Sequence, residues 1–348
     1  MSKKIGFSKL AKREEKTAWK LMIPTIIILL TIALFPLGQV FYTSFTDRTF
    51  ASDKETSFVG LDNYKELLSI KIKKLPEITN EQTGEVEYER AIKVLPRKPH
   101  RYKEFKQFSV FGNRYVIGAR DPAFIDSIWN TLIFTFFSIL LETTLGLIIA
   151  LIVNSNFKGR GAMRTIMLIP WAVITVVSAR IWEWMFTSNR AGLFNMIGDA
   201  LGITNGQTAF LSLEGLQIPA MIAVDVWKTS PYMALLLLAG LQTIPDELYE
   251  AAEIDGAGKL KQFFAVTLPL LKPALAVALI FRTLDALRVF DLFQVLLGGR
   301  KYSMATYNYF QLIGNQNMGL ASAIGVVIFI IIFVFAIFYI RALGVDEE

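Results

Sequence analysis

The sequence contains no cysteine and only one histidine among its 348 residues. Without cysteine, disulfide bonds, thiolate metal sites and cysteine nucleophiles are excluded. One imidazole, that of His100, is too few for a histidine metal site or a proton relay. The glycine-rich lysine loop of P-loop ATPases is absent, and no basic patch alternates with aromatic residues as in nucleic-acid-binding proteins. We therefore expect no metal, no bound cofactor and no nucleic-acid partner, and little catalytic equipment even for an integral-membrane enzyme.

Charge is scarce outside one segment of the chain. Residues 46–127 hold 28 charged side chains in 82 positions, whereas the other 266 residues hold 38. Over the whole chain 53% of residues are hydrophobic and the mean hydropathy is +0.44, which is more apolar than an ordinary soluble domain. The pattern predicts an integral membrane protein that carries one water-soluble insert.

Six stretches are apolar enough to cross a bilayer, which takes about 20 residues in a helix. The first could be mistaken for a signal peptide, but it is too long and has no small-residue cleavage site, so it is predicted to be a retained anchor. The expected membrane helices are 20–45, 128–153, 164–186, 218–242, 273–297 and 320–343.

The positions of lysine and arginine predict how these helices are oriented. Seven such residues precede or open the first helix, and cations are retained on the cytoplasmic side during insertion. Both termini are then cytoplasmic, and the charged insert lies outside, because loops longer than about 60 residues escape the charge rule. The predicted division is a basic N-terminus 1–19, a first helix 20–45, an extracytoplasmic insert 46–127, a five-helix core 128–343 containing a cytoplasmic loop 243–272, and a cytoplasmic tail 344–348.

The insert reads as a small mixed α/β subdomain. Asn63, with Glu66 three residues later, resembles the capped start of a helix. Residues 85–89 alternate in polarity after a Thr83-Gly84 turn, and 111–114 resemble the tip of a β-hairpin. The predicted fold class is therefore an all-α membrane domain of six helices with this α/β insert between helices 1 and 2.

The cytoplasmic loop 243–272 is patterned as two short helices. Thr243 with Asp246 forms an acidic capping pattern, and Pro245 suits a first helical turn. Gly256 stands where the first helix would end, because glycine tolerates the left-handed turn that closes a helix. A second helix is expected over 259–267, ending at Leu268-Pro269.

This loop resembles the coupling-loop signature of the membrane subunits of binding-protein-dependent ABC importers, with Val266 where isoleucine is usual. The resemblance implies an elbow of two helices that docks on a separate ATP-hydrolysing subunit, with Glu250 in polar contact with that subunit. An alternative is an amphipathic helix that lies on the membrane surface. The candidate ATPase-coupling residues are Glu250, Ala251, Ala252, Asp255, Gly256, Leu268 and Pro269.

Further motifs resemble the carbohydrate-importer branch of this family. They are 58–64, 130–132, 168–171, 182–186, Gly298-Gly299, where Arg300 replaces a frequent proline, and 281–291, which is similar to the run in maltose- and trehalose-type subunits. The resemblance implies a prokaryotic inner-membrane permease surrounded by lipid. Its expected partners are a second, different permease chain, two ATP-binding subunits that use ATP and Mg, and an extracytoplasmic sugar-binding protein.

Charges inside the predicted helices need partners, because an ionised side chain at the bilayer centre costs about 2.5–3.5 kcal/mol. Opposite charges three residues apart share a helix face and are expected to pair. The expected pairs are Arg180 with Glu183, Asp225 with Lys228, and those within a row of alternating sign on the fifth helix, Arg282, Asp285, Arg288 and Asp291. Glu142 has no such partner, so it is either protonated or bonded to a neighbouring helix, and it is given no role. Trp182 and Trp184 are expected to be interfacial anchors. The candidate pathway or gate residues, which could instead pin helix packing, are Arg282, Asp285, Arg288, Asp291, Asp225 and Lys228.

The sequence thus predicts a permease subunit, not an enzyme, for a disaccharide or short oligosaccharide such as maltose or trehalose. One alternative is an ABC permease for another small solute such as glycerol phosphate. A second is an ion-coupled secondary transporter that uses the buried carboxylates, and a third is an assembly scaffold that transports nothing.

Overall fold

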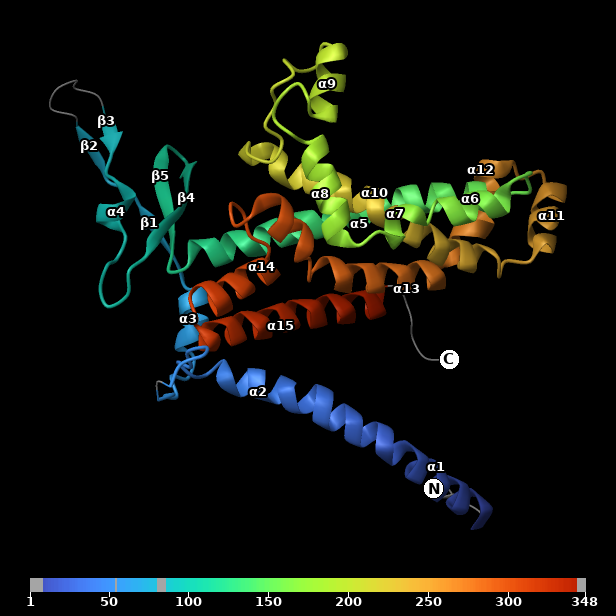
Figure 1. Ribbon diagram of the computed structural model, residues 1–348, viewed down its shortest axis with the longest axis horizontal. Helices are drawn as coiled ribbons and strands as arrows, with labels where there is room; N and C mark the ends of the chain where they lie inside the picture. Colours follow the sequence, from blue (N-terminus) through green and yellow to red (C-terminus); the bar gives the residue numbers. More distant parts are fainter. Residues whose placement is uncertain (1–8, 54, 80–85, 343–348) are drawn as a thin grey trace.

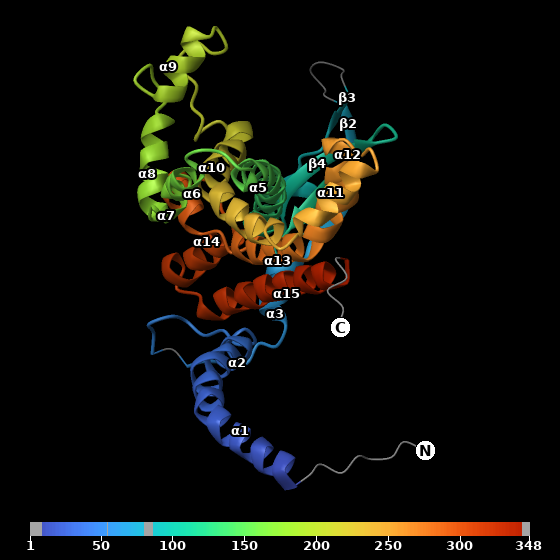
Figure 2. The same cartoon turned by 90° about the vertical axis from the view of Figure 1, so that its right-hand side faces the viewer.

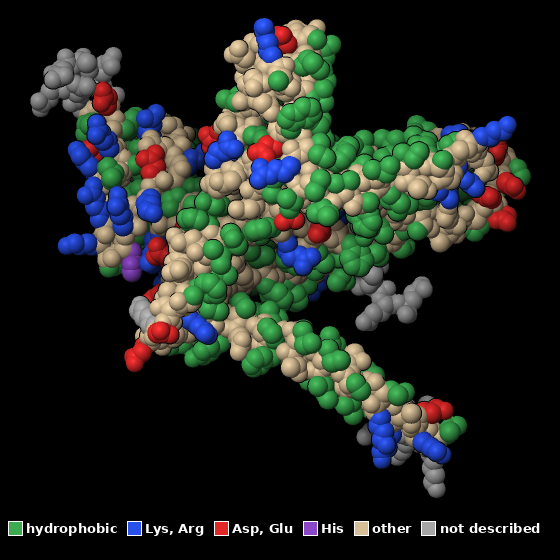
Figure 3. All heavy atoms as spheres, viewed as in Figure 1, with side chains coloured by type: hydrophobic (Ala, Val, Ile, Leu, Met, Phe, Trp, Pro, Cys, Tyr) green, Lys and Arg blue, Asp and Glu red, His purple; other side chains and the backbone are tan. Residues whose placement is uncertain are grey.

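The computed structural model describes residues 9–53, 55–79 and 86–342 of the chain. Long helices run through its middle, with the insert at one end and the segment 243–272 at the other (Figure 1). Charged side chains gather at these two ends, while hydrophobic side chains cover much of the long helices between them (Figure 3). This distribution is typical of a membrane protein, in which apolar side chains contact lipid and charged side chains contact water.

Among the described residues, five helices are long and apolar enough to span a membrane. A sixth span exists if a bent pair of helices, whose two parts meet at 86°, is counted as one. The helical membrane fold is confirmed, and the predicted span 164–186 falls on this bent pair, so the count of six crossings stays a prediction. The five helices are Arg13–Thr43, Pro122–Asn154, Glu214–Leu241, Lys259–Ala286 and Met318–Arg341, and the bent pair is Arg160–Ala172 with Thr175–Met185.

The first span leaves the other helices at an angle (Figures 1 and 2). It packs mainly against the last helix, where the rings of Phe41 and Phe329 meet edge to face with centroids 5.8 Å apart. None of its most apolar window is buried, so most of its surface is available to lipid or to another subunit. The segments involved are α1 (Lys9–Ile28), the π-helical η1 (Leu29–Leu34), α2 (Phe35–Thr43) and the last helix α15 (Met318–Ala342).

The core is built by three helices, α5 (Pro122–Asn154), α10 (Glu214–Leu241) and α13 (Leu268–Ala286). Glycine allows them to approach closely. A Cβ atom at Gly146 would lie 2.7 Å from the Met233 side chain, and in the same way the side chains of α13 leave no room for one at Gly240. Small residues at helix contacts are the usual means of tight packing in membranes.

Helix α5 begins earlier than the predicted 128. Asp121 caps it by accepting a hydrogen bond from the backbone N–H of Phe124 at 3.1 Å, and Pro122 occupies the first helical turn. Both residues are strongly favoured at these positions. The insert therefore ends near Asp121 and gives way directly to the core.

The bent span and the connections that follow consist of short helices. The chain opens between two of them at Val173, whose backbone is extended. The remaining elements of the core are α6 (Arg160–Ile166), α7 (Ile169–Ala172), α8 (Thr175–Met185), α9 (Leu193–Ala200), α11 (Asp246–Ile254), α12 (Lys259–Gln262), the π-helical η2 (Phe263–Thr267) and η3 (Phe293–Leu297), α14 (Met304–Tyr309) and the π-helical η4 (Phe310–Gly314).

The insert contains the expected mixture of helix and strand. Three strands form an antiparallel sheet in the order β1-β5-β4. Its strands β4 and β5 are joined by a hairpin whose tip is Phe111-Gly112, as predicted, and β2 and β3 form a separate pair. The predicted Thr83-Gly84 turn lies outside the described residues, as do the basic segment 1–8 and the tail 344–348. The elements are α3 (Asp62–Leu68), β1 (Ile70–Lys74), β2 (Glu77–Thr79), β3 (Val86–Tyr88), α4 (Ala91–Val94), β4 (Lys103–Val110) and β5 (Asn113–Ala119).

Asn63 does not cap the helix that it was expected to start. It lies inside α3, and its side-chain amide donates hydrogen bonds to the carbonyl oxygens of Ser44 at 2.8 Å and Thr46 at 2.9 Å. These carbonyls follow the end of α2, where a helix leaves backbone acceptors unpaired. The side chain thus fastens the end of the first span to the base of the insert.

Arg300 shapes the loop that the sequence places on the outer side of the membrane. It follows Gly298 and Gly299, which both have positive φ angles. Its guanidinium donates to the Leu297 carbonyl at 3.1 Å and to the hydroxyl of Ser212 at 2.9 Å. The loop before α14 is therefore tied to the segment before α10.

Candidate functional site

The predicted elbow is formed by α11 and α12, but Thr243 does not cap it. The Thr243 hydroxyl donates to the carbonyl of Gly240 at 2.8 Å, one turn back, so it closes α10. Pro245 occupies the N-cap position of α11, and Asp246 and Glu247 lie in the first turn, where free N–H groups favour anions. The acidic first turn was predicted correctly, and the capping residue was not.

The turn of the elbow depends on Gly256, which has φ +74°. L-residues with side chains rarely adopt this backbone, although a Cβ here would have nothing within 4 Å. Two hydrogen bonds hold the turn against the second helix: the Gln262 amide donates to the Ala257 carbonyl at 3.0 Å, and the hydroxyls of Tyr249 and Thr267 lie 3.0 Å apart. The elbow is thus a defined structure and not a loose loop.

The second helix does not end at Leu268-Pro269 as expected. From Lys259 to Ala286 the chain is one helix of 28 residues, composed of α12, η2 and α13. The π-helical turn η2 comes directly before Pro269, which lies in the first turn of α13. A π-bulge shifts the backbone bonding register, so the missing N–H of proline is accommodated without a break.

The candidate coupling residues are mostly accessible. Glu250, Ala251, Asp255, Gly256 and Pro269 are exposed, and Ala252 and Leu268 are half-buried. Two large apolar side chains flank the turn with most of their surface exposed, Ile254 at 88% and Leu260 at 74%.

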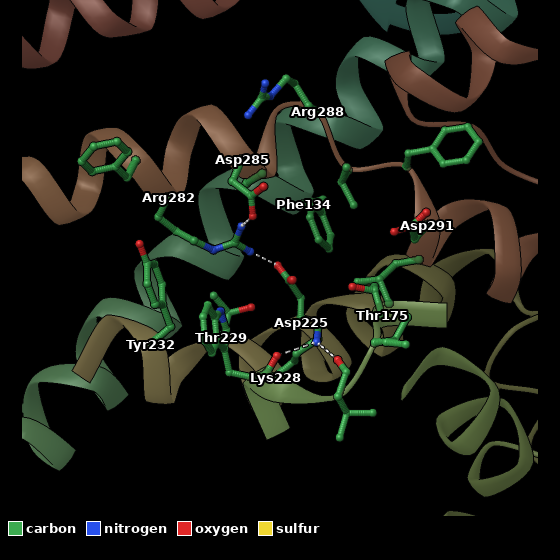
Figure 4. A pocket seen from close by; sticks show the side chains of 18 of the residues that line it. Phe134, Thr175, Asp225, Lys228, Thr229, Tyr232, Arg282, Asp285, Arg288 and Asp291 are labelled. Atoms are coloured by element: carbon green, nitrogen blue, oxygen red, sulfur yellow. Dashed lines mark hydrogen bonds and ion pairs between the residues drawn. The ribbon is translucent and has the colours of Figure 1, made fainter. Parts of the chain in front are cut away.

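A cavity of about 770 Å³ lies among the long helices, between α5, α10, α13 and the break that separates α7 from α8. All six candidate pathway residues line it, although they come from separate segments: Asp225 and Lys228 from α10, Arg282 and Asp285 from α13, and Arg288 and Asp291 from the chain that follows (Figure 4).

Arg282 is the centre of an ionic cluster in the wall of this cavity. Its guanidinium contacts Asp285 at 2.8 Å, as the sequence predicted, and also contacts Asp225 on the facing helix. It further donates to Glu142 on α5 through Nε at 2.5 Å and Nη2 at 3.0 Å. Arg282 is 3% exposed and Glu142 is fully buried, so one cation holds three helices together.

Lys228 does not pair with Asp225 as expected. Its ammonium donates to the carbonyl oxygens of Trp171, at 3.2 Å, and of Val173. These acceptors are exposed where α7 ends and the chain opens, and irregular backbone inside a membrane protein needs such partners. Asp225 is correspondingly available to Arg282.

The expected row of four charges on one fifth helix is wrong, because α13 ends at Ala286. Past this end the Val289 carbonyl accepts a hydrogen bond from the Ser303 hydroxyl at 2.6 Å instead of continuing the helix. Arg288 donates to the Leu284 carbonyl at 3.0 Å. Within the described residues, neither Arg288 nor Asp291 forms an ion pair, so both present charge to the cavity.

An aromatic pair completes the cavity wall. The rings of Trp171 and Tyr232 stack with centroids 5.2 Å apart and planes 7° apart, and both residues line the cavity. Trp182 packs in an aromatic cluster with Phe186 and Phe194, and Trp184 is 70% exposed, and neither is among the lining residues. The sequence analysis included Trp171 only within the motif 168–171 and did not predict it as a cavity residue. Its position directly after Pro170, close to a helix break, was the sequence signal that could have indicated this role.

The remaining charged residues of the predicted membrane helices lie outside the cavity lining. Arg180 and Glu183 pair at 2.6 Å as predicted, but Arg180 is exposed and Glu183 half-buried on α8, and neither lines the cavity. Glu142 is bonded to a neighbouring helix, which was one of the two alternatives left open. The signal for it was a lone acid in an apolar helix, which requires a cation from elsewhere in the fold.

Comparisons with known proteins agree with this architecture. Residues 142–343 match the family of the binding-protein-dependent transport system inner membrane component. The chain is 39% identical to the trehalose/maltose transport system permease protein MalF of Thermococcus litoralis, covering 96% of each sequence, and 31% identical to the trehalose transport system permease protein SugA of Mycobacterium tuberculosis, covering 97% of this chain and 92% of the relative.

Its fold matches a chain in the crystal structure of a bacterial ABC transporter involved in the import of the acidic polysaccharide alginate. The TM-score is 0.69 at 22% sequence identity, over 98% of this chain and 100% of the other. The match confirms the helical ABC permease fold. The family region contains the elbow and every residue that lines the cavity except Phe134. The chain therefore belongs to the inner membrane components of binding-protein-dependent transport systems, the permease subunits of ABC importers.

Proposed function

We propose that the chain forms half of the translocation pathway of an ATP-driven importer for a carbohydrate, a disaccharide or short oligosaccharide such as trehalose or maltose. The names of the two relatives above support this substrate class. The observation that carries the proposal is the cavity, in which a stacked aromatic pair and a set of carboxylates line one space.

The cavity suits a sugar in size and chemistry. Its volume, about 770 Å³, is within the usual range for small-molecule sites of roughly 300–1,000 Å³. Sugars present apolar C–H faces, which pack on aromatic rings such as Trp171, and hydroxyl groups, which donate to carboxylates such as Asp225 and Asp285. Charged acceptors form stronger hydrogen bonds than neutral ones, so they orient the ligand.

The energy source is proposed to be two separate ATP-binding subunits, which hold ATP and Mg while this chain holds neither. Their docking surface is the elbow, with Glu250, Ala251 and Asp255 exposed and Ile254 beside the turn. Closure of the ATP-binding subunits would displace the elbow and switch the cavity between outward-facing and inward-facing states.

The remaining partners follow from the same arrangement. A second permease, a different chain, would complete the pathway, and the unburied first span offers it a surface. An extracytoplasmic sugar-binding protein would deliver solute on the side of the insert. In this proposal the protein crosses a prokaryotic inner membrane six times, with 1–19 and 344–348 in the cytoplasm, 46–127 outside, and 243–272 inside.

Two alternatives lose support. Membership of a binding-protein-dependent family does not favour an ion-coupled secondary transporter. A glycerol phosphate permease would need free cations in its pathway, whereas Arg282 is saturated by carboxylates and Lys228 by backbone carbonyls. Arg288 is the only one of the three lining cations that binds no more than one described protein acceptor.

Reconstitution tests the proposal. Proteoliposomes that contain this chain, its partner permease and the ATP-binding subunits are supplied with the binding protein and radiolabelled trehalose or maltose. Uptake that requires both ATP hydrolysis and the binding protein is expected. Sugar uptake that persists without ATP hydrolysis, or transport of a non-carbohydrate solute alone, would overturn it.

A further inference from the structure

Glu142 lies behind the cavity wall and takes no part in lining it. It lies near the middle of α5 and is fully buried, and its side chain accepts hydrogen bonds from Arg282, 140 positions away in sequence. A buried carboxylate is costly unless it is paired, so its retention here calls for a purpose.

The geometry at Arg282 shows what Glu142 holds in place. Both carboxylate oxygens of Glu142 accept from the guanidinium, Oε2 from Nε at 2.5 Å and Oε1 from Nη2 at 3.0 Å. This two-point contact fixes the plane of the guanidinium as well as its position. The edge that remains meets the two cavity acids, Asp285 through Nη1 at 2.8 Å and Asp225 through Nη2.

The balance of charge in this cluster determines which groups the cavity wall presents to the solute. Three carboxylates surround the guanidinium of Arg282 on α13. Lys228 on α10 does not share them, because its ammonium is bound by the carbonyls of Trp171 and Val173. Arg282 itself is 3% exposed, whereas Asp285 is 73% exposed. This part of the wall therefore offers the solute carboxylate oxygens and withholds Arg282 and Lys228, while Arg288 is a lining cation outside the cluster.

We propose that Glu142 is a positioning residue that sets solute selectivity. By holding Arg282 within the wall as the counter-ion of Asp225 and Asp285, it keeps both carboxylates oriented to accept hydroxyl groups of a neutral solute. It also keeps the guanidinium from binding a carboxylate or phosphate of an anionic solute. This inference rests on the proposed function, since it concerns the same cavity.

Glu142→Gln tests the proposal, because glutamine keeps the side-chain size and removes the charge. The assembled permease–ATPase complex is purified, and its affinity is measured by equilibrium dialysis for radiolabelled trehalose or maltose and for the same disaccharide with one primary alcohol oxidised to a carboxylate. The ratio of the two affinities does not depend on how much of the preparation is folded. A merely structural role would leave that ratio unchanged.

In the wild-type complex we expect the neutral sugar to bind more tightly. Glu142→Gln should shift the ratio towards the anionic sugar by roughly tenfold, comparable to losing an outer partner of a metal ligand. In proteoliposomes the same variant should lower the maximal rate of neutral sugar uptake per assembled complex.

Three further variants make the test specific. Ser138→Ala lies about one turn away on α5 and removes a fully buried hydroxyl that has no described partner, so it should leave the ratio at the wild-type value. Glu142→Asp retains the charge and should restore much of the neutral preference. The double variant Glu142→Gln/Arg282→Gln should have the same affinity ratio as Arg282→Gln alone, because Glu142 acts through Arg282.

Arg282→Lys provides a second route if Glu142→Gln does not assemble. Lysine keeps the charge but lacks the planar fork that contacts three carboxylates, so the ratio should move in the same direction. An unchanged ratio in the variant that assembles overturns the inference. A wild-type complex that binds and transports no sugar would instead overturn the proposed function.

Discussion

The ammonium of Lys228 donates a hydrogen bond to the carbonyl oxygen of Val173, 55 residues earlier in the chain, at the point where the helix pair α7 and α8 bends. The same ammonium reaches the Trp171 carbonyl at 3.2 Å. A cation therefore closes the open end of α7 and holds one wall of the cavity against α10.

Replacing Lys228 by methionine should destabilise the bend. Two carbonyls would lose their donor, and an unsatisfied buried polar group costs about 1–3 kcal/mol. The melting temperature of the purified complex should fall, together with the uptake rate. Lys158→Met, at an exposed site between α5 and α6, is the control. Equal melting temperatures for the two variants would contradict a structural role for Lys228.

Gly256→Val should uncouple the chain from its ATPase without preventing membrane insertion. Valine resists the φ of +74° at this turn, at a cost of about 1–2 kcal/mol or more, so the elbow would change shape. Co-purification of the ATP-binding subunits and sugar-stimulated ATPase activity report the effect. Gly258→Val provides a matched control, since Gly258 has φ −66° and an extended backbone. If both variants couple normally, the elbow assignment fails.

Asp285→Asn should weaken neutral sugar binding by roughly tenfold while the complex assembles fully. The change removes a charged acceptor from the cavity, and hydrogen bonds to charged groups contribute about 1.5–3 kcal/mol. Equilibrium dialysis of the purified complex measures it. Glu183→Gln removes a paired carboxylate outside the cavity and should bind sugar normally. Loss of assembly with unchanged affinity would show that Asp285 only pins helices.

Trp171→Leu should reduce affinity for the sugar by several-fold. Leucine keeps an apolar side chain but removes the stacked ring, and aromatic contacts contribute about 0.5–1.5 kcal/mol beyond burial. The same binding assay applies, with Trp184→Leu, outside the cavity, as the comparison. A larger loss from Trp184→Leu would place the sugar elsewhere.

The β-structure of the insert can be removed as a unit. The backbone N–H of Arg120 donates to the Ser69 carbonyl at 3.1 Å, so the chain enters and leaves the sheet at adjacent points. A variant in which 70–119 are deleted and Ser69 is joined to Arg120 should still insert into the membrane and pair with the second permease. It should no longer bind the sugar-loaded binding protein, which a pull-down measures. Normal binding would show that the insert is not the docking site of the binding protein.

Much of the fold follows from local sequence patterns. Hydropathy located five long helices, and the alternation around 111–114 located the hairpin. Gly256 indicated the turn of the elbow, because a positive φ is a requirement of the backbone alone. Features of this kind depend on residues close in sequence, which is why they could be predicted.

The failures share a different physical origin. The opening at Val173 depends on Lys228, and the break after Ala286 depends on the Ser303 hydroxyl, which donates to the Val289 carbonyl, so each is decided by a distant side chain. Spacing of three residues suggested that Asp225 would pair with Lys228, but Arg282 on another helix is the partner. Glu142 was left without a role for the same reason.

The continuous helix from Lys259 to Ala286 has a mechanical consequence. At about 1.5 Å per residue, the 23 steps from Lys259 to Arg282 span roughly 35 Å in a single rod. This helix has the elbow at one end and the ionic cluster at the other, with the π-helical turn η2 and Pro273 between them. If the ATP-binding subunits displace the elbow as we propose, the helix carries that displacement to Arg282, whose contacts with α5 and α10 would resist opening of the cavity.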